Sequence, residues 1–178
     1  MGSSYPIGAF AACDARVVGI SPMADFKIRP AREDDAVAIA QIHIDARRVA
    51  MPWLPVIHTF EDTVQFFGDF VIANQIVRVA ESEGAVAGFI AIEGAFVDHL
   101  YVAPAHQSVG IGGALLKFAK ETRPEGLKLW TFERNSKARS FYEKRGFVAI
   151  EFTDGSRNEE RTPDVLYQWN PARLIGGE

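Results

Sequence analysis

Cysteine is almost absent from this chain of 178 residues, since Cys13 stands alone. A lone cysteine cannot form an internal disulfide, so nothing points to an oxidising compartment, and a passive thiol is the expected reading of Cys13. Apolar runs are short as well, and none approaches the ~20 residues of a membrane-spanning helix. The N-terminus lacks the basic and long apolar regions of a signal peptide. We therefore expect a cytoplasmic protein that does not bind a membrane.

An excess of positive charge is also missing. The formal net charge is −4, which argues against nucleic acid as the main partner, because phosphate binding requires a basic patch. Apolar residues make up 48% of the chain and charged residues 24%, so a buried core is expected and wholesale disorder is not.

Metal-binding patterns are missing too. His43, His58 and His106 do not have the spacing of metal ligands, and the chain contains neither C-x-x-C nor H-E-x-x-H. We expect no catalytic metal.

The length suggests a single domain. Residues 1–25 contain scattered Gly, Ser and Pro without a clear period, and Met23 begins a stretch that reads like a natural protein start. We interpret 1–25 as a poorly ordered N-terminal extension, 26–170 as the functional domain and 171–178 as a C-terminal tail.

The domain has alternating strand and helix patterns, which predict an α/β fold with a mixed sheet and helices on its faces. Asp34 is the expected N-cap of the first helix, and Thr59 begins a capping box for the second. The expected strands are 26–29, 76–81, 85–92, 96–102, 127–132, 147–152 and 165–169, and the expected helices are 34–48, one from 59, 111–123 and 136–145.

A glycine-rich turn lies between the strand that ends at Val102 and the helix that starts near Ile111. Its sequence is Gln107-Ser108-Val109-Gly110-Ile111-Gly112-Gly113. Glycine permits close approach of a ligand to the backbone, and the free N–H groups and dipole of a helix start attract anions. The spacing matches neither a P-loop nor a dinucleotide-binding fingerprint. Taken alone, the turn fits a pyrophosphate site and a simple packing connection equally well.

A second motif favours the pyrophosphate site. Asn135, Ala138 and Tyr142 lie on one short helix, and seven residues separate Asn135 from Tyr142, so the three share a face. A slender ligand fits along the small Ala138, with the Tyr142 phenol near its end. The alternative is that Tyr142 is a core aromatic beside Phe141 and Phe147.

Together, these segments resemble the signature motifs of the GNAT superfamily of N-acetyltransferases. Gln107, Gly110 and Gly112 match its [Q/R]-x-x-G-x-[G/A] pattern, and the chain matches N-x-x-A-x-x-x-Y-x-x-x-G-F from Asn135 to Phe147. The resemblance spans about residues 26 to 169. It implies a mostly antiparallel mixed sheet of about seven strands flanked by about four helices, with acetyl-CoA as the acetyl donor.

The resemblance also implies a cofactor site. Its members in this chain are Leu100, Tyr101, Val102, Gln107, Ser108, Val109, Gly110, Ile111, Gly112, Gly113, Asn135, Ala138 and Phe141. The backbone of 100–102 is expected to hold the pantetheine like an added strand and to present an N–H to the thioester carbonyl. Family members often carry Gly and a cation where this chain has Ser108 and Val109. We therefore expect no side-chain cation near the phosphates, and backbone N–H groups carrying most of the pyrophosphate binding.

The implied reaction is attack by a primary amine on the thioester, in a ternary complex. By resemblance, Tyr142 is the general acid for the thiolate. Asp98 is the expected base, acting through water, because strand alternation puts it on the side of Leu100 and Val102, and a carboxylate in an apolar strand is costly unless it is paired or functional. A structural hydrogen bond of Asp98 is the alternative, with Glu93 as a second candidate base. His99 is expected on the opposite face.

The acceptor remains open from the sequence. The segments 47–58 and 153–163 are expected to form its pocket, with 51–55 either walling the site or covering the core, and Trp130 facing either the acceptor or the interior. A small-molecule amine and a peptide or protein amine stay equally open. So does the oligomeric state, although folds of this kind often form a homodimer. Two other classes compete with an enzyme: an acetyl-CoA-binding sensor with little turnover, against which the intact Tyr142 argues, and an unrelated binding module whose glycines only pack.

Overall fold

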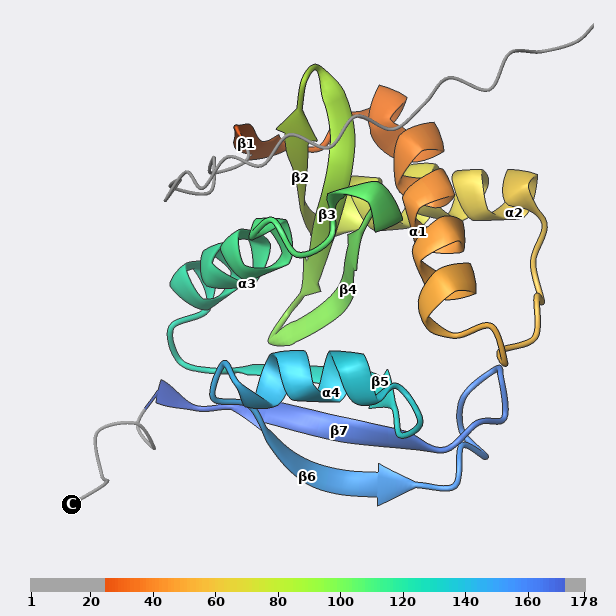
Figure 1. Ribbon diagram of the computed structural model, residues 1–178, viewed down its shortest axis with the longest axis vertical. Helices are drawn as coiled ribbons and strands as arrows, with labels where there is room; N and C mark the ends of the chain where they lie inside the picture. Colours follow the sequence, from red (N-terminus) through yellow and green to blue (C-terminus); the bar gives the residue numbers. More distant parts are fainter. Residues whose placement is uncertain (1–24, 172–178) are drawn as a thin grey trace, which may run out of the picture.

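The computed structural model describes residues 25–171, and these form one seven-stranded sheet with the strand order β1-β2-β3-β4-β5-β7-β6 (Figure 1). The predicted extension and tail lie outside the described residues except for Asp25 and Pro171, and Cys13 lies outside them too. The elements are β1 (Phe26–Pro30), η1 (Glu33–Asp35), α1 (Ala36–Ala50), α2 (Phe60–Gln65), η2 (Phe66–Ile72), β2 (Ile76–Ser82), β3 (Ala85–Glu93), β4 (Phe96–Val102), η3 (Pro104–His106), α3 (Ile111–Thr122), β5 (Leu127–Phe132), α4 (Ser136–Glu143), β6 (Val148–Thr153) and β7 (Asp164–Trp169).

The predicted mixed α/β fold and order of elements are confirmed. Thr59 caps α2 as expected, since its hydroxyl accepts the backbone N–H of Asp62 at 3.1 Å. The start of the first helix differs. Asp35, rather than Asp34, accepts the backbone N–H of Arg32 at 2.7 Å, and the chain makes a short 3-10 turn before α1. Asp35 also accepts hydrogen bonds from Arg29, whereas the Asp34 side chain is exposed. We attribute the choice of Asp35 at the helix start to this additional partner.

The sheet consists of two antiparallel halves that meet at one parallel junction. Strands β1 to β4 form the first half, and β5, β7 and β6 form the second. Strands β4 and β5 share a single paired position, Phe96 with Lys128, and the two halves then diverge, as Figure 1 shows. Beyond this point, the edge of β4 that faces β5 has no strand beside it.

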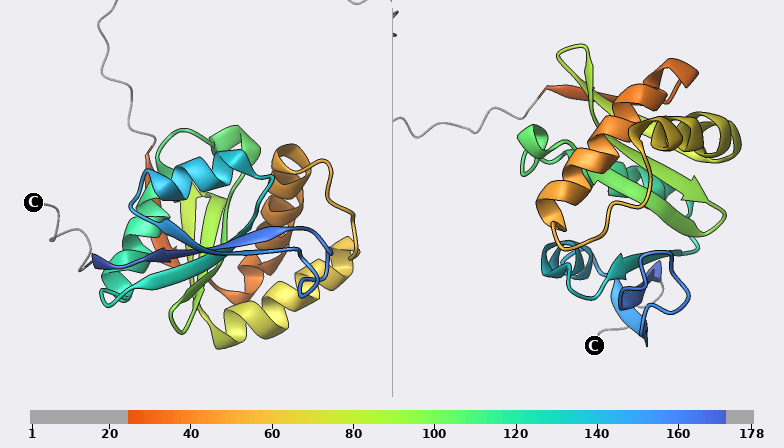
Figure 2. Two further views of the ribbon diagram at one scale, coloured as in Figure 1. Left: turned by 90° about the horizontal axis from the view of Figure 1, so that it is seen from below. Right: turned by 90° about the vertical axis from the view of Figure 1, so that its right-hand side faces the viewer.

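Helices cover the two faces of the sheet unequally (Figure 2). Helices α3 and α4 cover one face, where Leu115, Leu116 and Tyr142 pack against strands of both halves. Helix α1 and η2 cover the other face, where Ile39 and Phe67 pack against the β1–β4 half.

Helix α3 lies close to the sheet because β3 carries a glycine beneath it. A Cβ on Gly88 would lie 3.0 Å from Ile111 Cγ2 and 3.0 Å from the Tyr101 carbonyl oxygen. A side chain at this position would push the start of α3 away from β4, so Gly88 sets the depth of the turn that precedes this helix.

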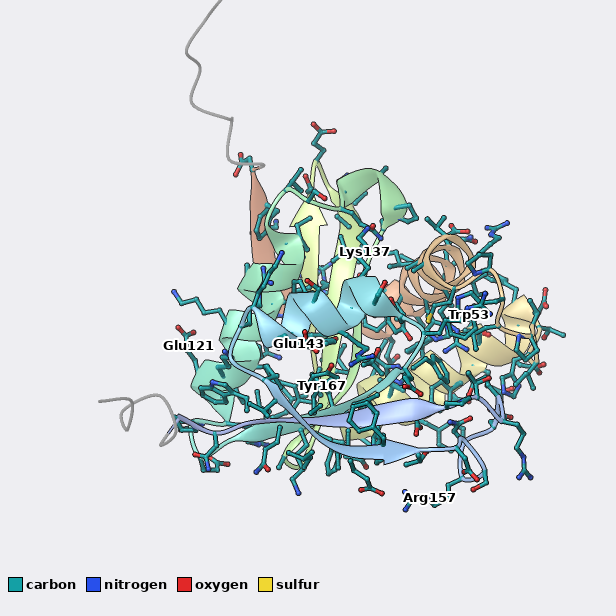
Figure 3. All side chains as sticks on the ribbon, turned by 60° about the horizontal axis from the view of Figure 1, so that its bottom comes forward. Trp53, Glu121, Lys137, Glu143, Arg157 and Tyr167 are labelled. Atoms are coloured by element: carbon teal, nitrogen blue, oxygen red, sulfur yellow. The ribbon has the colours of Figure 1, made fainter. Side chains whose placement is uncertain are left out.

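Polar contacts fix α4 on the sheet. The Tyr167 hydroxyl on β7 accepts from Arg139 Nε at 3.0 Å and donates to Glu143 Oε1 at 2.6 Å, and Figure 3 shows Glu143 and Tyr167 between α4 and β7. Lys120 on α3 donates to the Arg145 carbonyl at 2.6 Å. These contacts hold the Asn135–Tyr142 face in a set orientation.

Within residues 25–171, no helix is both long and apolar enough to cross a bilayer.

We expect the Arg29–Asp35 ion pair to stabilise the fold most strongly at neutral pH. Arg29 donates to both carboxylate oxygens of Asp35, at 2.7 and 2.9 Å, and this hydrogen bonding lowers the pKa of the Asp35 carboxyl. A carboxyl whose pKa is lower in the folded protein than in the unfolded chain stabilises the fold fully at a pH above its unfolded pKa of about 3.9. This stabilisation is lost as the pH falls through the pKa of the folded state. Asp35→Asn should therefore reduce the free energy of unfolding by about 2–3 kcal/mol at neutral pH, and by much less near pH 3.

Urea unfolding at both pH values measures this difference. The exposed neighbour Asp34 supplies the control, since Asp34→Asn should change little. An equal loss for Asp35→Asn at both pH values would contradict the linkage.

Candidate active site

The site begins at the open edge of β4. Ala103 donates its N–H to the Ala87 carbonyl on β3 at 2.8 Å. Because hydrogen-bonded positions alternate in an antiparallel pair, the backbone groups of Tyr101 also face β3, whereas those of Leu100 and Val102 point into the gap toward β5. The strand thus presents N–H and C=O groups to a ligand in the gap.

The turn after β4 is tied back to that strand. Gln107 Nε2 donates to the Val102 carbonyl at 3.2 Å. Ser108 and Gly110 then adopt positive φ angles of 67° and 98°, and α3 begins at the next residue, Ile111. Gly110 has open space where a Cβ would be, so the backbone at the start of α3 is accessible to an anion.

Asn135 has a structural role in addition to its place beside the site. Its side-chain oxygen accepts the Ala138 N–H at 3.2 Å and so caps α4. The same helix carries Tyr142 two turns further on. The cap therefore sets where the shared face begins.

These three elements enclose a cavity of about 410 Å³, within the range of small-molecule sites. Most of the cofactor residues expected from the sequence line it, together with Tyr142. Val109 and Ile111 do not: Val109 is exposed and the Ile111 side chain is buried in the core, so only their backbone groups can reach a ligand. The lining residues are Ala46, Ala50, Met51, Leu100, Tyr101, Val102, His106, Gln107, Ser108, Gly110, Gly112, Gly113, Asn135, Lys137, Ala138, Phe141, Tyr142 and Arg145.

Two cations, Lys137 and Arg145, line this cavity, although the sequence led us to expect no side-chain cation near the phosphates. Lys137 is on the side of α4 that faces the turn, and its Nζ donates to Gln107 Oε1 at 2.9 Å (Figure 3). The Arg145 guanidinium stacks 3.7 Å from the centre of the Phe141 ring, and its Nη2 lies 3.3 Å from the position of a Cβ on Gly113. The turn itself contains no cation, and the charge comes from another segment, since Lys137 lies on α4 and Arg145 lies two residues after its end.

Tyr142 lies at the inner part of the cavity and is 9% exposed. Burial raises the pKa of its phenol, and the nearby Tyr101 adds to this effect. The hydroxyl therefore keeps its proton throughout the neutral range. Its ring also contacts Phe141 and Phe147, so the core interpretation and the site interpretation of Tyr142 both apply.

Asp98 does not lie where strand alternation predicted. A bulge interrupts β4: Ala91 pairs with His99 and Ile92 pairs with Val97, so Asp98 has no partner on β3. Its carboxylate accepts from Gln75 Nε2 at 2.9 Å, on the face covered by α1 and η2. The expectation that Asp98 shares a face with Leu100 and Val102 is therefore wrong, because an extra residue reverses the alternation. His99 does lie on the face opposite Leu100, as expected.

The bulge lies where the two sheet halves separate. Phe96, two residues earlier, forms the last pair with β5. The Asp98 side chain remains 40% exposed and is not among the residues that line the cavity. The carboxylate is thus on the α1 side of the gap. Glu93, the second candidate, is an exposed residue at the end of β3.

The two segments expected to form the acceptor pocket contact each other. Arg47 at the end of α1 forms a 2.5 Å ion pair with Glu160 in the β6–β7 loop, and His58 lies 3.0 Å from the Glu159 carboxylate. Figure 2 shows the α1–α2 connection passing beside that loop. Trp130 is 41% exposed, so it does not pack in the interior.

The 51–55 segment divides between its two interpretations. Met51 is buried and lines the cavity, whereas Trp53 packs edge-on against Phe132 with ring centres 5.9 Å apart. Arg134 covers the Trp53 ring at 5.1 Å. Among the described residues, no group of three or more His, Cys, Asp or Glu side chains is placed to hold a metal ion.

Comparison with known proteins agrees with this geometry. Residues 73–149 match the family model described as an acetyltransferase (GNAT) domain. The peptidyl-lysine N-acetyltransferase YiaC of Escherichia coli is 27% identical over 143 residues, which are 80% of this chain and 95% of that protein. The probable N-acetyltransferase Rv2775 of Mycobacterium tuberculosis is 52% identical over 52 residues, 29% of this chain and 30% of its own. The PaiA N-acetyltransferase of Thermoplasma acidophilum, solved in complex with coenzyme A, shares the fold with a TM-score of 0.65 at 21% identity, over 82% of this chain and 99% of that one.

The family-model match and the named relatives support an acyltransferase that uses acetyl-CoA. The chain is thus similar to GNAT N-acetyltransferases in its sequence, over residues 73–149, and in its fold.

Substitution of Gly112 tests the role of the turn. A Cβ at Gly112 would lie 3.5 Å from the Phe141 ring and 3.6 Å from Val102 Cγ2, so the two further methyl groups of a valine would fill the space between α3 and β4. Gly112→Val should abolish acetyl-CoA binding as measured by calorimetry. Ala114→Val, on the same helix but outside the cavity, should keep the affinity. A folded Gly112→Val protein that binds with wild-type affinity would reject the proposed phosphate site.

Proposed function

We propose that this protein transfers the acetyl group of acetyl-CoA to a primary amine by direct attack within a ternary complex, with Tyr142 as general acid and Asp98 as water-mediated base. The observation that carries the proposal is the cavity, which brings the open edge of β4, the glycine turn and the Asn135–Tyr142 face together. The pyrophosphate would take the backbone N–H groups at the start of α3, with Lys137 and Arg145 beside it. The pantetheine would lie along Leu100 and Val102.

The chemical step requires three groups. A base removes a proton from the acceptor ammonium, and the free amine attacks the thioester carbon to form a tetrahedral oxyanion. A backbone N–H of β4 donates to that oxyanion. The carbon–sulfur bond then breaks, and the Tyr142 hydroxyl gives its proton to the leaving thiolate.

The environment of Tyr142 supports this assignment. A buried phenol stays protonated, and a thiolate that forms beside it loses water as well, so burial raises the proton affinity of both groups. The proton transfer therefore does not depend on the low acidity of an isolated phenol in water.

We propose a lysine side chain of a peptide or protein as the acceptor. Two features support it: the E. coli relative is named as a peptidyl-lysine N-acetyltransferase, and the loop beside Arg47 carries Glu159, whose side chain is 60% exposed. Carboxylates at the rim of a site attract a cationic chain and slow the approach of anionic amines.

A panel of amines tests the acceptor class. Lysine-containing peptides, free lysine, small aliphatic amines and anionic amines are each supplied with acetyl-CoA, and release of CoA is followed. Peptides with an internal lysine and a blocked N-terminus should give the highest kcat/KM, and peptides in which arginine replaces the lysine should give none. Equal rates for peptides and small amines would contradict the proposed acceptor but not the acetyl transfer.

Removal of one hydroxyl group tests Tyr142. Tyr142→Phe should lower kcat by roughly 10²-fold and change acetyl-CoA affinity little, because the ring that lines the cavity remains. Tyr167→Phe is the comparison variant: its hydroxyl holds Arg139 and Glu143 and so helps to orient α4, and its loss should lower the melting temperature and reduce kcat much less than loss of the Tyr142 hydroxyl. Wild-type turnover of Tyr142→Phe would remove Tyr142 as the acid.

A further inference from the structure

Asp98 has two polar neighbours that take no part in the proposed chemical step. Its Oδ2 accepts the Gln75 amide at 2.9 Å, and His99 Nε2 lies 3.3 Å from the same oxygen. Gln75 follows η2, so the two neighbours come from different elements. Both meet the carboxylate at the bulge where the sheet halves part.

The polar atoms behind this carboxylate are incompletely paired. Among the described residues, Gln75 Oε1, His99 Nε2 and His43 Nδ1 are buried and form no hydrogen bond. Buried polar atoms in native proteins normally have a partner, and exceptions gather at functional sites. Here two of them, on α1 and β4, belong to one aromatic cluster, with 6.0 Å between the ring centres of His43 and His99. The third belongs to Gln75, the side chain that donates to Asp98.

The cluster also keeps its histidines neutral. His99 lies among aromatic rings, with its ring centre 5.1 Å from that of Phe67 and 6.0 Å from that of Phe66. Burial lowers the pKa of His99, Asp98 opposes this shift, and Arg47 adds to it. Burial likewise lowers the pKa of His43 to about 3, with further contributions from Arg47, His99 and His58. Neither imidazole carries a charge at neutral pH.

Asp98 thereby differs from the carboxylates that hold the fold together. Asp35 and Glu81 both bind Arg29, and Glu160 binds Arg47, so each faces a permanent cation that favours the ionised form. Asp98 instead faces an amide and a neutral imidazole. An amide donates through its nitrogen or accepts through its oxygen after a half-turn, and a neutral imidazole does both through its two nitrogens.

We propose that Gln75 and His99 are positioning residues that allow Asp98 to gain and release a proton during turnover. Both neighbours lie at Oδ2, where Gln75 Nε2 donates and His99 Nε2 is 3.3 Å away, and they hold the carboxylate in one orientation. Oδ1 is left to take up the proton of the acceptor through water and to release it after turnover. The proposal rests on the role of Asp98 as base, and it assigns to its neighbours a function that a purely structural pair would not have.

Opposite charges at one position provide the sharpest test. Gln75→Glu places a like charge beside Asp98 and should move the acidic limb of the kcat/KM profile to higher pH, by about one unit. Gln75→Lys places a cation there, so the limb should move to lower pH, and kcat should fall because the carboxylate becomes a weaker base. His99→Phe should lower kcat roughly tenfold, and His99→Gln, which restores a group able to donate and accept, should recover most of it.

The controls separate this inference from the assignment of the base. Asp98→Asn should abolish the acidic limb. His43→Phe removes a buried imidazole of the same cluster that does not contact Asp98, so the limb should stay in place. Titration of ¹³C-labelled aspartate carboxyls by NMR should place the Asp98 midpoint of Gln75→Glu at higher pH and that of Gln75→Lys at lower pH than in the wild type, without any need for turnover. Thermal melts confirm that each variant folds.

Each outcome decides one question. Opposite shifts for the two Gln75 variants, together with rescue by His99→Gln, support the proposal. If Asp98→Asn removes the limb but the Gln75 and His99 variants leave it in place, or both Gln75 variants shift it in one direction, the network is rejected and the base stands. If Asp98→Asn keeps the limb, both the base and the network are rejected.

Discussion

The separation of β4 from β5 is the constraint on which the site depends. A strand inside a sheet normally satisfies its backbone on both sides, yet β4 pairs with β5 at Phe96 alone and then leaves Leu100 and Val102 with backbone groups directed into the gap. A ligand with its own amide groups can take those positions as an added strand would. Each half is a complete antiparallel unit, and one core beneath α3 and α4 packs against strands of both halves on either side of the opening.

Helix α4 links the two ends of that opening. Asn135 sets its start, Tyr142 lies at the inner part of the cavity, and Lys137 and Arg145 bring positive charge to the turn. The helix is only 8 residues long, and a helix of that length has little stability of its own. Its contacts with Tyr167 and Lys120 therefore set the orientation of its groups. A short helix anchored in this way holds Lys137 and Tyr142 on one rigid element beside the cavity.

The carboxylates of the chain fall into two electrostatic classes. Asp35, Glu81 and Glu160 face arginines and join segments that are distant in sequence, which favours ionisation and stabilises the fold. Asp98 lies at a bulge beside neutral groups that both donate and accept hydrogen bonds. The first environment favours a permanent charge. The second is the one that the proposed role of Asp98 as base requires.

Local patterns in the sequence were sufficient for the elements, the glycine turn and the Asn135–Tyr142 face, but not for Ala46, Ala50, His106, Lys137 and Arg145, which also line the cavity. The hydrophobic periods, the Thr59 cap and the Asn135–Tyr142 spacing depend on neighbours along the chain, and the structure agrees with them. Other features depend on contacts between segments. The bulge that turns Asp98 to the α1 face arises from β3 pairing, and the cations beside the turn come from α4 and the residues just after it. The sequence by itself determined the fold class, the family motifs and the position of Tyr142, because these repeat at short range. Only the tertiary structure decided the side of the sheet that Asp98 faces and the source of charge around the cofactor, because these depend on pairing between residues far apart in the chain.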